Sequence, residues 1–198
     1  MGNTDKFLQH VRDHLSEYGF TLKRGRGELI NSGDGWRAAG YFCGDSKIIA
    51  YAGGGTDWLS TLTHEYAHFL QWLDSGAVEC RRDGNASNAV EEFLYNSGKL
   101  TKAVREAFRR VIFFERDAEM RARNLIIAYN LPISIEKYVK KANCYLYSYH
   151  VTMEYGLWNF KKSPYSSSSV LKNMPSSFRS RPDLKCPPHI FAMLKKYY

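Results

Sequence analysis

The chain has 198 residues, of which 44% are apolar and 15% aromatic, which is enough for one compact domain with a buried core. Lys and Arg exceed Asp and Glu by 28 to 20, and this charge of +8 favours weak, nonspecific attraction to nucleic acid. No apolar run of membrane-spanning or signal-peptide length occurs, so we expect a cytoplasmic protein that does not bind a membrane. The four cysteines are dispersed, which favours reduced thiols over a disulfide framework or a zinc ribbon.

The first predicted elements are a helix and a small sheet. Apolar residues repeat at helical spacing over residues 3–18, and Gly19 is a suitable helix stop. Residues 20–52 contain short apolar runs broken by turn residues, a pattern typical of a small antiparallel sheet. The expected strands are Glu28–Ile30, Trp36–Phe42 and Lys47–Ala52.

Helices are predicted for most of the remaining chain. Thr56 or Asp57 is a suitable N-cap for a helix that runs to about Leu73, with a loop expected over 77–85. Further helices are predicted at about 86–97, 100–129 and 135–157. The fold class is therefore α+β, with a small antiparallel sheet followed by a mostly helical remainder.

The C-terminal part has a different composition from the rest. We expect a domain over residues 1–160 and a basic, Ser/Pro-rich segment over 161–198 that packs on it or extends from it. Basic residues and a terminal tyrosine pair in this segment suggest weak binding to nucleic acid, through charge and base stacking. Alternatively, three apolar residues dock the segment on the core: Ile190, Phe191 and Leu194.

The motif that indicates chemistry is His64-Glu65-Tyr66-Ala67-His68, an HExxH pattern on a predicted helix. Two imidazoles four residues apart share one helical face, within reach of one zinc ion. Glu65 projects about 60° away from His68 and suits a general base beside the metal. The helix packs through its other side, on which the large apolar residues lie. The alternative is a chance motif on a solvent-exposed helix.

A catalytic zinc needs a third protein ligand. Glu115 and Glu119 both fall inside the apolar stripe of the helix at 100–129, where unpaired carboxylates cost several kcal/mol. We expect Glu115 to bind zinc and Glu119 to accept the outer N–H of a ligating histidine. Exchanged roles for the two, or salt bridges from both to neighbouring arginines, stay open. His10 and His14 share the four-residue spacing but lack such partners, and we expect no metal there.

These residues resemble the gluzincin clan, in which HExxH is followed by a Glu-x-x-x-Asp motif on a later helix, although Glu119 stands here in place of the Asp. The run from Glu115 to Ala122 also resembles ImmA/IrrE-type metallopeptidases, and the chain is similar to small phage-encoded metallopeptidases. The resemblance covers about residues 57–122. It implies a zincin-like fold, Zn²⁺ as cofactor, and hydrolysis of peptide bonds in an intracellular protein.

The implied reaction is attack of a zinc-activated water on a carbonyl, with Glu65 transferring the proton to the leaving amine. His150, Tyr149 and Tyr145 on the later helix are candidates to stabilise the oxyanion, and each is alternatively an ordinary core aromatic. Two other functions stay open. One is a DNA-associated protein with a structural or degenerate zinc site, and the other is a zinc amidase acting on cell-wall peptide.

Overall fold

The computed structural model describes residues 2–31, 37–96, 98–157, 163–178 and 185–198, with the backbone alone over 75–83. The chain forms two compact units. The first comprises Met1–Gly76 with Ala118–Ile133, and the second comprises Ala77–Asp117 with Ser134–Tyr198. No helix in the described part of the chain is both long and apolar enough to cross a membrane.

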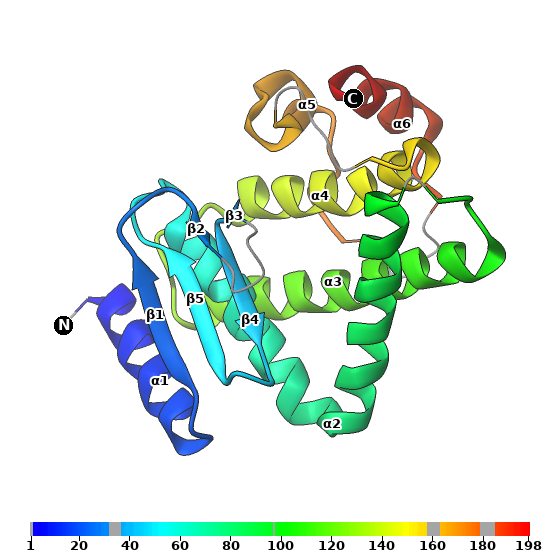
Figure 1. Ribbon diagram of the computed structural model, residues 1–198. Coiled ribbons are helices and arrows are strands. Elements are labelled where there is room, and N and C mark those ends of the chain that lie inside the picture. Colours follow the sequence, from blue (N-terminus) through cyan, green and yellow to red (C-terminus); the bar gives the residue numbers. More distant parts are fainter. Residues whose placement is uncertain (1, 32–36, 97, 158–162, 179–184) are drawn as a thin grey trace. The chain divides into compact units, whose positions relative to one another are not determined.

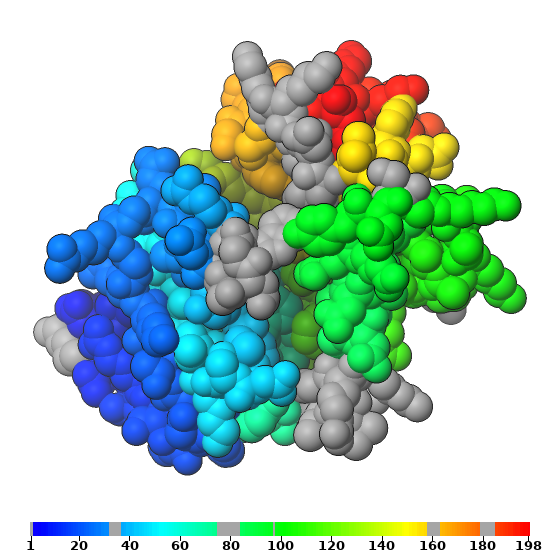
Figure 2. All heavy atoms as spheres, viewed as in Figure 1, coloured from blue at the N-terminus to red at the C-terminus, as the bar shows by residue number. Residues whose placement is uncertain are grey.

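The first unit begins with helix α1 (Asn3–Glu17), which confirms the helix predicted at this end of the chain. Gly19 adopts a left-handed φ of 72°, a conformation that favours glycine and ends the helix. α1 buries Phe7, Val11 and Leu15. Figure 1 shows α1 alongside the first strand, and its side chains continue into those of the strands as one blue-to-cyan surface in Figure 2.

The main sheet has three strands in the order β1-β5-β4, namely β1 (Thr21–Gly25), β4 (Gly40–Cys43) and β5 (Ile48–Ala52). β4 pairs antiparallel with β5, whereas β1 pairs parallel with it, so the prediction of an antiparallel sheet is wrong for this pair. The reason is topological: the chain turns back through the β4–β5 hairpin, and β5 enters between β4 and β1. A separate antiparallel pair is formed by β2 (Ile30–Asn31) and β3 (Arg37–Ala38).

Helix α2 (Trp58–Tyr95) is continuous, so the predicted helix stop near Leu73 and the loop over 77–85 are wrong. A single glycine in a helix costs only about 1 kcal/mol, and the residues around Gly76 and Gly84 otherwise permit helix. α3 (Lys102–Ala128) confirms the next long helix. Both helices pass from one unit into the other.

The first half of α2 packs on the sheet, as Figure 1 shows. The ring of Trp58 stacks on Tyr51 of β5 with centroids 5.8 Å apart. On β4, a Cβ at position 40 would lie 2.6 Å from the methyl group of Thr61 and 2.9 Å from Cγ of Glu65. Because glycine has no Cβ, Gly40 allows the edge strand to approach the motif of α2 this closely.

Another side of α2 packs on α1. Tyr66 is 1% exposed, and its hydroxyl lies 2.6 Å from Nδ1 of His14 and 3.0 Å from Nε2 of His10. Phe69 is fully buried in the same region, with its ring edge against His14. The two histidines of α1 therefore hydrogen-bond a core tyrosine and attach α1 to the helix that carries the motif.

The second unit is helical. α4 (Ile135–Tyr155) confirms the predicted helix; its N-cap Ser134 accepts a hydrogen bond from the backbone N–H of Lys137, and Gly156 ends it at a left-handed φ of 66°. One apolar cluster joins α2, α3 and α4 through residues that include Val90, Phe108 and Leu146.

The C-terminal segment is folded where the structure describes it, and the expectation of an extended chain is wrong there. It forms the 3₁₀ turn η1 (Pro164–Ser166), α5 (Ser168–Lys172), α6 (Pro188–Leu194) and η2 (Lys195–Tyr197). Val170, Ile190 and Leu194 are almost fully buried in a cluster that includes Cys144 and Val151 of α4. These apolar contacts offset the Ser- and Pro-rich composition of the described part of the segment.

Candidate metal centre

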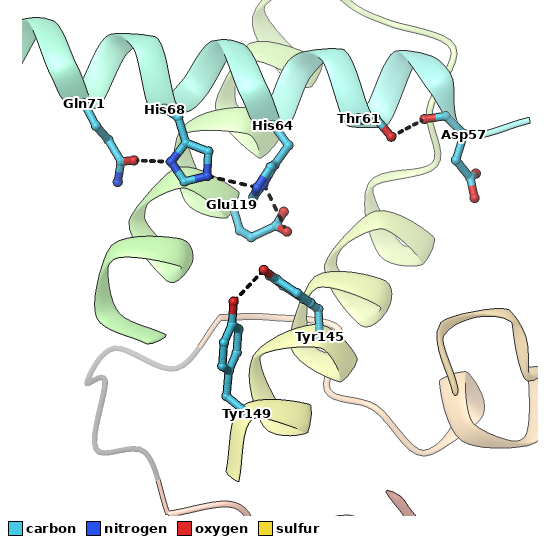
Figure 3. A network of polar contacts seen from close by, with 8 residues as sticks. All are labelled: Asp57, Thr61, His64, His68, Gln71, Glu119, Tyr145 and Tyr149. Carbon is cyan, nitrogen blue, oxygen red and sulfur yellow. Dashed lines mark hydrogen bonds and ion pairs between the residues drawn. The ribbon is translucent and has the colours of Figure 1, made fainter. Parts of the chain in front are cut away.

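The HExxH residues form a compact group on α2. His64 and His68 are one helical turn apart and project from the same side of the helix, as Figure 3 shows. Their Nε2 atoms lie 3.1 Å from each other. The possible ligand atoms of His64, Glu65 and His68 are all within 4.8 Å of one another, which makes the group a candidate metal site.

The separation of the two Nε2 atoms fits a shared metal ion. Zinc binds imidazole nitrogen at about 2.0–2.1 Å, so two ligands of one tetrahedral ion lie about 3.3 Å apart. The observed 3.1 Å is close to this value. The residues present therefore fit a metal ion held between the two rings.

The outer nitrogen of each ring faces an oxygen. Nδ1 of His64 lies 3.3 Å from a carboxylate oxygen of Glu119 on α3, and Nδ1 of His68 lies 2.8 Å from Oε1 of Gln71 (Figure 3). Metal-binding histidines usually have such a partner, which orients the ring. The structure thus brings Glu119 to the ligand pair, whereas Gln71 is a residue that the sequence analysis missed. Its only sequence signal is its place three residues after His68.

Two carboxylates are buried in this group. Glu65 is 8% exposed and Glu119 is 7% exposed. Removing charged carboxylates from water costs several kcal/mol unless cations or hydrogen bonds compensate. Two imidazoles and two carboxylates form a mixed nitrogen and oxygen set of the kind that zinc prefers, and a divalent cation would offset the buried negative charge.

The other predicted site residues belong to the second unit. There the hydroxyl groups of Tyr145 and Tyr149 are 2.7 Å apart. Burial first, and then the carboxylate of Glu115, raise the pKa of both hydroxyls, so both stay protonated at neutral pH. Glu115 is therefore near the tyrosine pair. Burial lowers the pKa of His150 to about 4, so this imidazole is neutral at pH 7.

The basic C-terminal residues are only partly described. Arg179 and Arg181 lie outside the described residues. Tyr198 stacks on Tyr155 with centroids 5.8 Å apart and hydrogen-bonds Thr152, and the ammonium group of Lys195 lies 5.6 Å from the centre of the Tyr155 ring. Tyr198 thus contacts residues of its own unit.

Comparison of the chain with protein-family models, with curated proteins and with solved structures found no match.

We expect the protein, prepared without chelator, to contain about one zinc ion per chain and to lose it in His64→Ala and His68→Ala, because each change removes a ligand. Elemental analysis after gel filtration measures this. His10→Ala and His14→Ala are matched controls, since these histidines share the four-residue spacing on a helix, and they should keep the metal. Full zinc content in His64→Ala and His68→Ala would contradict the assignment.

Proposed function

We propose that this chain is a zinc-dependent metallopeptidase that hydrolyses peptide bonds of an intracellular protein substrate. The observation that carries the proposal is the pair of Nε2 atoms 3.1 Å apart, with the buried Glu65 carboxylate in the same group. In this proposal His64, His68 and Glu115 hold the metal, and Glu119 orients His64. A bound zinc would act as a Lewis acid toward a carbonyl oxygen and make water nucleophilic at neutral pH.

Glu65 is the general base in this proposal. Its carboxylate would accept the proton of the attacking water and then donate it to the amine that leaves when the peptide bond breaks. The burial of Glu65 and the packing of its Cγ against Gly40 of β4 support this role. A general base held in one position needs less reorganisation when the reaction occurs.

The neighbouring strand favours a peptide substrate. β4 is an edge of its sheet, with β5 as its described partner, and its Gly40 packs against Glu65. An extended peptide can pair with the main chain of an edge strand as one more strand. Such pairing would bring a scissile bond beside the general base, and it favours a peptide over a small-molecule amide.

Glu115 is proposed as the third ligand on the basis of its place in the sequence and in α3. α3 is continuous over Lys102–Ala128, and Glu115 precedes Glu119 by one turn on the same face, about 6 Å along the axis. We propose that the oxyanion accepts hydrogen bonds from Tyr149 and His150, with Tyr145. The hydroxyl groups of Tyr145 and Tyr149 stay protonated, which supports their role as donors.

Glu65→Gln should retain the fold and the zinc but lose at least about 100-fold in hydrolysis, because only the proton acceptor is removed. The assay is hydrolysis of casein by the purified protein, with and without a chelator, together with circular dichroism and zinc content. If the wild-type protein binds zinc but cleaves neither casein nor any other unfolded protein, that result would favour a structural or degenerate zinc site. An active Glu65→Gln variant would show that Glu65 is not the base.

Glu115→Ala should remove zinc almost completely, whereas Glu119→Ala should weaken zinc affinity by about 10–100-fold, because it removes an orienting partner and not a ligand. Competition with a fluorescent chelator measures both affinities. Glu106→Gln is the control, since Glu106 lies on the same helix but its exposed side chain pairs with Arg109 at 2.7 Å. If Glu119→Ala removed the metal and Glu115→Ala did not, the two roles would be exchanged.

A further inference from the structure

Gln71 is a buried polar residue on the helix that carries the candidate ligands. It is 4% exposed and follows His68 by three residues, which places both side chains on neighbouring positions of α2. Its Oε1 lies 2.8 Å from Nδ1 of His68, a normal hydrogen-bond distance. Figure 3 shows the amide beyond His68, away from His64.

With the amide oxygen of Gln71 toward the ring, this contact favours one tautomer of His68. An amide oxygen accepts hydrogen bonds and donates none, so the bond to Gln71 requires the proton on Nδ1. A neutral imidazole has one N–H, and Nε2 then has a free electron pair directed at the candidate metal position. Without an acceptor at Nδ1, the proton can move to Nε2 and form an N–H···N bond to Nε2 of His64, which lies 3.1 Å away. That bond would compete with metal binding.

We propose that Gln71 is a positioning residue that holds His68 as its Nδ1–H tautomer and so keeps Nε2 available to a metal ion. The inference rests on the proposed metal site and adds the residue that prepares its second histidine. Gln71 acts through His68 and does not itself bind the metal.

The use of an amide suits the charge of this site. His64 already has a carboxylate partner, Glu119, and the carboxylate of Glu65 is buried in the same group. A third carboxylate at position 71 would add to the cost of burying negative charge. Glutamine supplies the same acceptor oxygen without a charge, so it fixes the ring orientation and leaves the metal to compensate the two carboxylates.

The tautomer can be measured in metal-free protein. Long-range ¹H–¹⁵N spectra of histidine-labelled protein at about pH 8 distinguish Nδ1–H from Nε2–H rings, and the His68 signals are those absent from His68→Ala. Wild-type His68 should have the Nδ1–H pattern. Gln71→Met, which keeps the length of the side chain but has no strong acceptor, should shift His68 toward Nε2–H, whereas Gln71→Glu should retain Nδ1–H.

Zinc affinity, measured by chelator competition, gives the second readout. Gln71→Met should weaken it by about 10–100-fold, while Gln71→Glu, which restores an acceptor, should weaken it less. Thr63→Val is the matched control: Thr63 is buried on the same helix, and its hydroxyl donates to the backbone oxygen of Leu59 at 2.7 Å, so its loss should change neither readout.

Three outcomes would overturn the inference: an Nε2–H ring in the metal-free wild-type protein, an unchanged tautomer in Gln71→Met, or unchanged affinity in that variant. The first does not depend on Gln71→Met, so the test holds even if that variant does not fold. A protein that binds zinc and shows these tautomers but hydrolyses no peptide would contradict the proposed function and leave the role of Gln71 intact.

Discussion

The site depends on the close approach of two imidazole nitrogens. Nε2 of His64 and Nε2 of His68 are 3.1 Å apart, and their outer nitrogens face Glu119 and Gln71. Two electron pairs at this distance repel each other unless a proton or a metal ion lies between them. The hydrogen bond between His68 and Gln71 and the ion pair between His64 and Glu119 orient the two rings, so a cation is the natural complement of the pair.

The fold provides the rigidity that this arrangement needs. α2 is fixed on one side by the sheet, where Gly40 contacts Glu65, and on another by α1, where His10 and His14 hydrogen-bond Tyr66. A metal site is effective when its ligands are held near their final geometry before the ion binds. Both histidines of α1 contact the hydroxyl of Tyr66, so replacing one of them leaves the other contact in place.

Local patterns predicted the parts of the site that a single helix determines. His64, Glu65 and His68 follow from the four-residue spacing, because that spacing places them on neighbouring positions of any helix. Glu119 was expected from its place in an apolar stripe, and it faces His64. Gln71 could not be predicted, since a glutamine three residues after a histidine is equally compatible with solvent.

The errors in the fold arose where distant contacts decide the structure. β1 was missed because the sequence Thr-Leu-Lys-Arg-Gly has no apolar alternation, and its parallel partner β5 is more than twenty residues away. The loop expected after Leu73 was based on Gly76, yet α2 continues through this glycine. The Ser- and Pro-rich C-terminal segment folds because Val170, Ile190 and Leu194 bury themselves against α4, a contact that composition does not reveal.

X-ray absorption at the zinc edge of the zinc-loaded protein tests the central claim most directly. The account predicts two imidazole nitrogens at about 2.0–2.1 Å from the metal, with oxygen completing the four-coordinate shell. A shell of oxygen alone, or one that contains sulfur, would contradict the claim that His64 and His68 together hold the ion.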